Sequence, residues 1–132
     1  MDAKAQAESQ FLAAEPQLQE LSRWMYEHPE IAYEEHQTSA RLASFLQEQG
    51  FDVEYPAYGL ETAFSARFGS TGPEVVICAE LDALPGVGHA CGHNVIATAA
   101  IGAGIAVAGL TESLGFRVTV LGTPAEEKTG RR

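Results

Sequence analysis

The sequence predicts an α/β fold in which two N-terminal helices precede a mixed sheet with a βαβ unit. Three observations support this class. Apolar residues recur at helical spacing in residues 1–50, and short alternating or β-branched segments follow. Near the end of the chain, a stretch of small apolar residues separates two strand-like segments. The length of 132 residues fits one domain.

The first helix is indicated by Leu18, Leu21 and Met25, which recur at helical spacing. It should end near His28, because Pro29 disfavours helical geometry in the residue before it. A second helix is expected at about residues 35–49. Its apolar face holds Leu42, Phe45 and Leu46. Gly50 follows as the expected C-terminal cap of this helix.

Strand periodicity begins after this helix. The segments "FDVEY" and "TAFSARFG" alternate apolar and polar residues, as half-buried strands do. Residues 74–80, "EVVICAE", are typical of a central strand, with Cys78 in the core. Residues 94–110 predict a buried helix, with Asn94 as its N-cap, and residues 116–122 predict another strand. Strand, helix and strand in this order predict two parallel strands joined by a right-handed crossover.

Composition bounds the function. Hydrophobic residues make up 45% of the chain and charged residues 20%, so a packed core is feasible. The net charge of -10 argues against a nucleic-acid or anionic-membrane partner. No basic segment followed by an apolar run opens the chain, so a cytoplasmic protein is expected. Cys78 and Cys91 are the two cysteines, too few for a disulfide framework, and a bridge between them is not expected.

Three candidate metal ligands, His89, Cys91 and His93, fall within five residues in "GHACGHN". Imidazole and thiolate both bind zinc and neighbouring transition metals, and the surrounding glycines allow a tight backbone path. The alternative is a glycine-rich turn with solvated histidines. His28 and His36 lie outside this group and are interpreted as structural or exposed.

Carboxylates follow both parallel strands. Asp82 comes just after the first, and Glu126 and Glu127 come just after the second. Since ligands of open α/β sheets bind beyond the carboxyl ends of the strands, these residues should converge with the His/Cys loop. One glutamate could bind a metal while the other acts as general base. The alternatives are a solvated acidic pair, and a turn-capping role for Asp82.

Nucleophilic catalysis is the competing chemistry. Cys91 lies between two histidines and could be an activated thiolate. A metal explains the nearby carboxylate pair better.

The order of motifs resembles a known family. "ELDALPGVGHACGHN", a helix, a strand and then "GTPAEE" resemble the co-catalytic-metal amidohydrolase branch of the aminoacylase/carboxypeptidase metallopeptidases. The upstream "HPE" turn and acidic pair fit the same family. The form of the motifs is most similar to the dipeptidase and p-aminobenzoyl-glutamate hydrolase types.

The resemblance implies roles for five residues. Cys91, His93 and Glu127 would bind metal, Glu126 would be the general base, and Asp82 would support the metal site. His89 belongs to the motif but is not a usual ligand. The implied reaction is hydrolysis of an amide bond in a dipeptide or N-acyl amino acid, with zinc or manganese as cofactor.

The resemblance covers only the N-terminal part of such an enzyme. Complete members hold two ions, carry two further histidine ligands and form homodimers through an inserted domain. Here "KTGRR" stands where the family continues with glycines, and no histidine follows Glu127. Residues 1–132 are therefore expected to be a truncated portion of a three-layer catalytic domain, and the sequence does not decide whether this portion is active alone. A non-catalytic metal-binding or partner-binding remnant is the alternative.

Overall fold

The computed structural model describes residues 2–129 and consists of five helices and four strands within that range. In chain order they are α1 (Ala3–Glu27), α2 (His36–Glu48), β1 (Asp52–Glu54), β2 (Phe64–Phe68), β3 (Glu74–Glu80), α3 (His93–Ala108), α4 (Thr111–Leu114), β4 (Arg117–Thr123) and α5 (Glu126–Thr129). This order confirms the α/β class.

The four strands form one mixed sheet in the order β1-β2-β4-β3. β1 pairs with β2, and β2 with β4, in antiparallel ladders, whereas β3 and β4 run parallel. Ile77 lies opposite Val120 in the parallel ladder, and α3 connects these two strands. The predicted βαβ unit is therefore confirmed.

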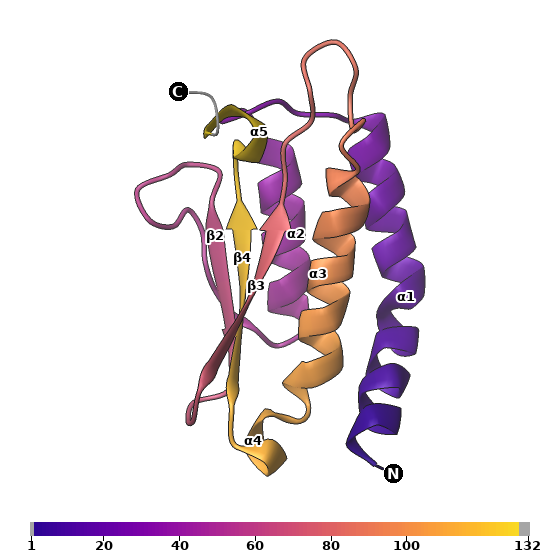
Figure 1. Ribbon diagram of the computed structural model, residues 1–132, viewed down its shortest axis with the longest axis vertical. Coiled ribbons are helices and arrows are strands. Elements are labelled where there is room, and N and C mark those ends of the chain that lie inside the picture. Colours follow the sequence, from indigo (N-terminus) through magenta and orange to yellow (C-terminus); the bar gives the residue numbers. More distant parts are fainter. Residues whose placement is uncertain (1, 130–132) are drawn as a thin grey trace.

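The three long helices lie on one side of the sheet (Figure 1). α3 packs on β3 and β4, α2 packs on β1 and β2, and α1 packs against α3. The core between these layers contains Leu18 and Met25 from α1, Leu46 from α2 and Val120 from β4, all buried. None of the described helices is long and apolar enough to cross a membrane.

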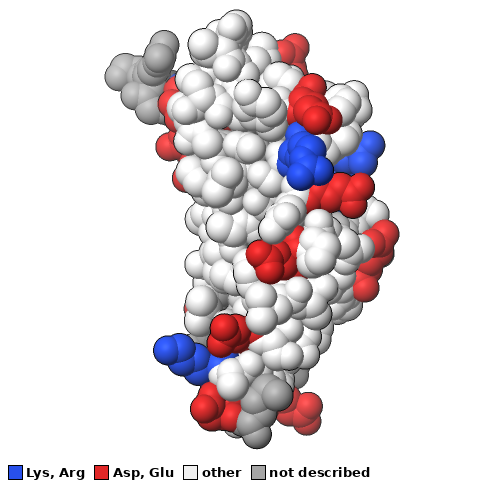
Figure 2. Space-filling view, turned by 90° about the vertical axis from the view of Figure 1, so that its right-hand side faces the viewer, with Lys and Arg blue, Asp and Glu red and all other residues white. Residues whose placement is uncertain are grey.

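The surface on the α1 side carries more acidic than basic side chains, in line with the acidic composition. Figure 2 shows acidic side chains spread along this face, with basic side chains gathered toward its upper part and its lower end. Large uncharged areas separate them. This face presents no broad basic surface of the kind that binds phosphate backbones.

The helix ends follow the predicted signals in α1 and α2. α1 ends at Glu27 with His28 as its C-cap, directly before Pro29. α2 ends at Glu48, and Gly50 follows its C-cap with φ of +94°, a conformation that suits glycine.

The N-cap predicted for α3 is wrong. Gly92, in the left-handed conformation at φ 80°, precedes the helix, and Asn94 lies inside its first turn. The amide Nδ2 of Asn94 donates instead to the carbonyl and hydroxyl oxygens of Ser22 on α1, at 3.4 and 3.3 Å. Because this side chain ties α3 to α1, it serves packing between helices rather than the helix end.

Within the described residues β3 is an edge strand rather than a central one, and Cys78 is not in the core. β3 lies at the edge of the described sheet, and Ala79 is its one buried residue. Val75 and Val76 are each about half exposed, and Cys78 is exposed. A β-branched run fits an edge strand as well as a central one, so this pattern could not separate the two. Both Cys78 and Cys91 are free thiols, as expected.

Candidate metal centre

The candidate site lies where β3 and β4 end and where α3 and α5 begin, at the top of the molecule in Figure 1. Glu80 is the last residue of β3, and His93 is the first residue of α3. Glu126 and Glu127 open α5 directly after β4. The parallel pairing of β3 with β4 is what brings these segments to one edge of the sheet.

Asp82 organises this edge from a fully buried position, with 1% of its surface exposed. Its Oδ1 accepts a hydrogen bond from the backbone amide of Glu126, and its Oδ2 accepts one from the amide of Glu127, both at 3.1 Å. Oδ1 also lies 3.2 Å from Nδ1 of His93. A single carboxylate therefore connects both glutamates to the histidine, and the predicted convergence is found.

The imidazole of His93 is fixed from one side. Its Nδ1 lies 2.7 Å from the backbone carbonyl oxygen of Asp82. A carbonyl oxygen can only accept, so Nδ1 must carry the proton in this hydrogen bond. Nε2 is then the nitrogen of His93 that can bind a metal.

Three carboxylates surround that nitrogen. Glu80 Oε2 lies 2.8 Å from Nε2 of His93, Glu126 Oε2 lies 3.6 Å away and Glu127 Oε1 lies 3.7 Å away. Ligand atoms of Glu80, His93 and Glu126 all fall within 4.8 Å of one another, as the donors of one ion would. A buried imidazole among carboxylates is a donor set that suits zinc or manganese.

Cys91 joins this group through Glu127. The thiol is exposed on the loop before α3, and a hydrogen bond with the Glu127 side chain raises the pKa of Cys91 to about 11. Glu126 and Asp82 add to this effect through their charges. The thiol is therefore protonated at neutral pH in the absence of a cation, and binding a metal there would release its proton.

His89 makes no hydrogen bond to the carboxylate group. It is 7% exposed, and neither ring nitrogen has a hydrogen-bond partner among the described residues. Burial lowers the pKa of His89, with His93 contributing in the same direction. Of the three residues predicted from the "HACGH" motif, Cys91 and His93 therefore contact the carboxylates, whereas His89 makes no hydrogen bond to them.

The pKa of Glu126 is shifted by its neighbours. Burial, followed by the charges of Glu80 and Glu127, raises the pKa of Glu126 above its usual value. A carboxylate whose pKa moves toward neutrality both accepts and returns a proton more readily.

Two residues at the site have roles that the sequence did not predict. Glu80 stands two positions before Asp82 at the end of β3, and that spacing was the available signal, because alternate residues of a strand share a face. Glu35 is fully buried; its carboxylate accepts from Thr62 Oγ1 at 2.9 Å and from the Ala125 amide at 2.8 Å. Glu35 thus holds the loop that carries Glu126.

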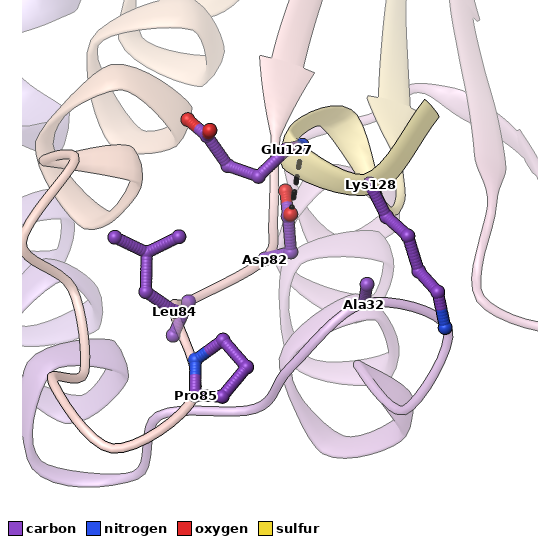
Figure 3. Close-up of a pocket in the computed structure, with 7 residues that line it drawn as sticks. Ala32, Asp82, Leu84, Pro85, Glu127 and Lys128 are labelled. Carbon is purple, nitrogen blue, oxygen red and sulfur yellow. Dashed lines mark hydrogen bonds between the residues drawn. The ribbon is translucent and has the colours of Figure 1, made fainter. Parts of the chain in front are cut away.

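A small cavity of about 220 Å³ adjoins the site (Figure 3). Its apolar lining comes from Ala32, Ala83, Leu84 and Pro85, and Asp82, Glu127 and Lys128 complete the wall. Figure 3 shows Leu84 and Pro85 on one side, Ala32 and Lys128 on the other, and the hydrogen bond between Glu127 and Asp82 between them. An apolar pocket with a few polar groups is the usual form of a small-molecule subsite.

The chain is similar to several metal-dependent hydrolases. It is 38% identical to the Xaa-Arg dipeptidase of Mus musculus over 146 aligned positions, covering 96% of this chain and 33% of that protein. It is 36% identical to a p-aminobenzoyl-glutamate hydrolase polypeptide of Escherichia coli, over 78% of this chain and 25% of that one. No protein-family profile matches the chain.

A solved structure agrees with these relatives. The Bacillus subtilis YXEP protein, a dinuclear metal-binding peptidase of the M20 family, superimposes with a TM-score of 0.76 at 27% identity. The match covers 87% of this chain and 36% of that one. The chain therefore belongs to the M20 family of peptidases and amidohydrolases. It spans about a third or less of the length of the curated relatives named above.

Proposed function

We propose that this chain forms part of the centre of a metal-dependent amidohydrolase that cleaves an amide bond in a dipeptide or an N-acyl amino acid. The observation that carries the proposal is the buried carboxylate of Asp82, which holds the amides of Glu126 and Glu127 and lies 3.2 Å from His93. The proposal takes residues 1–132 as the N-terminal portion of such a catalytic domain, in line with the share of each relative that the chain spans.

The residues divide the work between binding and proton transfer. Cys91, His93 and Glu127 bind a divalent ion, zinc or manganese, and Asp82 orients His93 through Nδ1. When bound, the ion supplies Lewis acidity, which acidifies water and polarises the scissile carbonyl. Glu126 takes the proton of the attacking water and returns it to the leaving amine. Binding the metal and accepting the proton require two different carboxylates, so the two adjacent glutamates have different roles.

The adjoining cavity suits a small substrate group. Its lining is mostly apolar, and it opens beside Glu127, so one side chain or a short acyl group of the substrate could occupy it. Activity on dipeptides belongs by name to the mouse relative, and hydrolysis of p-aminobenzoyl-glutamate to the bacterial one. These names support an amide substrate of similar size.

The thiol mechanism is disfavoured by the contacts of Cys91. An activated thiol needs a neighbouring cation or base, whereas the partner here is the Glu127 carboxylate, which raises the pKa of Cys91 to about 11. The imidazole nitrogens of His93 lie 2.7 Å from an oxygen of Asp82 and 2.8 Å from an oxygen of Glu80.

The test is hydrolysis by the metal-free chain after addition of Zn²⁺ or Mn²⁺, using a panel of dipeptides and N-acetyl amino acids. The proposal expects amine release that disappears on chelation and falls by about 10²–10⁴-fold in Glu126→Gln. Glu112→Gln is the matched control, because Glu112 is exposed on α4, far from α5 in Figure 1.

Each other outcome favours a specific alternative. Metal binding without hydrolysis of any panel member would support the non-catalytic metal-binding form of this chain. Hydrolysis that survives chelation but not alkylation of Cys91 would support the thiol enzyme and overturn the proposal.

A further inference from the structure

Glu80 contacts the candidate metal-binding nitrogen more closely than any residue assigned to the site above. Its Oε2 lies 2.8 Å from Nε2 of His93, compared with 3.7 Å for Oε1 of Glu127. The Glu80 side chain is 30% exposed and that of His93 only 3%, so the carboxylate stands between the buried ring and solvent.

The backbone of Glu80 holds the carboxylate in place. Glu80 is the last residue of β3 and pairs with Thr123 in the parallel ladder to β4. The next residue, Leu81, extends the pairing, since its amide donates to the Thr123 carbonyl at 3.2 Å. A ligand on a hydrogen-bonded strand needs little reorganisation to bind.

The geometry of the contact suits a shared cation. Nδ1 of His93 donates to the Asp82 carbonyl oxygen, which leaves Nε2 directed at Glu80. At 2.8 Å apart, the Glu80 oxygen and this nitrogen are both within reach of one ion. Two further carboxylates, Glu126 and Glu127, face the same nitrogen and increase the demand for positive charge.

We propose that Glu80 is itself a ligand of the ion that His93 binds. This inference rests on the metal site proposed above and adds a fourth protein ligand to Cys91, His93 and Glu127. Four protein ligands still leave a position for the attacking water on an ion that takes five or six ligands. The chain would then hold one ion with its own residues, even though it spans only about a third of its relatives. In this proposal Glu126 keeps the role of general base.

Co²⁺ is a suitable probe, because its visible absorption changes with the number and type of its ligands. The metal-free 132-residue chain is titrated with CoCl₂ as wild type, Glu80→Gln and Glu74→Gln. Glu74 lies at the opposite end of β3, about 20 Å away at strand rise, so Glu74→Gln makes the same charge change on the same strand. Its hydrogen bond from Thr119 survives in the glutamine.

The expected result is a Co²⁺ affinity at least about 10-fold weaker in Glu80→Gln, together with an altered visible spectrum of the loaded protein. Glu74→Gln should match the wild type in both. An unchanged spectrum in Glu80→Gln would overturn the inference whether or not affinity falls, because a residue that only positions His93 leaves the ligand set intact. Far-ultraviolet circular dichroism checks that each variant is folded.

Glu80→Asp gives a second measurement that does not depend on Glu80→Gln folding. The shorter carboxylate should recover part of the lost affinity with a spectrum unlike the wild type. A wild-type spectrum and affinity in Glu80→Asp would show that only nearby charge matters, which contradicts the inference.

His93→Ala separates this inference from the proposed function. If the wild type binds no Co²⁺, or if His93→Ala binds it equally well, the metal site itself is wrong. If His93→Ala loses binding while Glu80→Gln keeps both affinity and spectrum, the site stands and only the role of Glu80 fails.

Discussion

The carboxylate of Glu35 accepts a hydrogen bond from the backbone amide of Ala125, at 2.8 Å and across 90 residues of sequence. Ala125 has φ of 56°, a left-handed conformation that is unusual for a residue with a side chain. Ala125 directly precedes Glu126, so Glu35 stabilises a strained turn at the site. Asp82 holds the next two amides in the same way.

Glu35 should make stability depend on pH. Burial raises the pKa of Glu35 from its usual 4.5, so the folded protein binds this proton more tightly than the unfolded chain. The contribution of Glu35 to the free energy of unfolding is then greatest below pH 4.5 and is lost as the pH rises through the folded pKa. Urea unfolding between pH 4 and 7 should show this slope in wild type and a flatter one in Glu35→Gln.

Glu34→Gln is the control, because Glu34 is the exposed neighbour of Glu35. The measured quantity is the difference in slope between each variant and wild type, since Glu126 also has a raised pKa and contributes to all three proteins. Equal slopes in wild type and Glu35→Gln would contradict this account of Glu35.

Asp82→Asn should destabilise the metal-free protein and weaken metal binding. The NH2 group of asparagine cannot accept a hydrogen bond, so one of the Glu126 and Glu127 backbone amides loses its partner in a partly buried place. The expected loss of unfolding free energy is about 1–3 kcal/mol. Zn²⁺ affinity should fall by roughly 10–100-fold.

Urea unfolding and competition with a zinc chelator measure the two effects. Asp52→Asn on the exposed start of β1 is the control and should change neither. Normal zinc affinity in Asp82→Asn would mean that Asp82 supports the loop without tuning the site.

Local signals explain how much of the fold could be predicted. Pro29 and Gly50 mark the ends of α1 and α2, and the strand–helix–strand order dictates the parallel pair β3 and β4. The position of β3 at the sheet edge could not be predicted, because strand order is set by tertiary packing. The misplaced Cys78 follows from that single error.

The candidate site was likewise predictable only in part. The convergence of Asp82 with Glu126 follows from the topology, since both residues come just after parallel strands. Glu35 belongs to the acidic pair that fits the family, but its contact with Ala125, 90 residues away, could not be predicted. Glu80 carried a weak signal in its spacing from Asp82, but its contact with His93 depends on where α3 begins.

Gly122→Ala should destabilise the protein through steric conflict. A Cβ at Gly122 would lie 2.2 Å from the Cε1 atom of Phe64, and Phe64 is fully buried in the core. The ring cannot move away without disturbing its neighbours, so a loss of about 1–3 kcal/mol is expected. Thermal unfolding of Gly122→Ala measures this loss of stability. Gly59→Ala is not an adequate control, because Gly59 has a positive φ that alanine would not adopt without strain.

Gly109→Ala is the better control. Gly109 has φ of -68°, and an added Cβ there would meet nothing nearer than 3.6 Å. This variant should keep or slightly raise the wild-type stability, because alanine reduces the freedom of the unfolded chain. Equal effects of Gly122→Ala and Gly109→Ala would show that the approach of Phe64 to β4 is looser than the structure has it.

Cys91 should react slowly with alkylating agents in the metal-free protein. The hydrogen bond with Glu127 raises the pKa of Cys91 to about 11, so little thiolate is present at pH 8. Glu127→Gln removes that negative charge and should speed alkylation by iodoacetamide at pH 8. The measurement uses the Cys78→Ser background, because Cys78 is exposed and would react as well.

Zn²⁺ provides the second half of this test. Binding of the ion to Cys91 should protect the thiol from iodoacetamide in the Cys78→Ser protein, because the metal occupies the sulfur lone pair that attacks the reagent. In the Cys78→Ser, Glu127→Gln protein, protection should require more Zn²⁺, since one ligand is lost. If Zn²⁺ leaves the alkylation rate unchanged in both proteins, Cys91 is not a ligand, and the ion must depend on His93 and the carboxylates of Glu80 and Glu127.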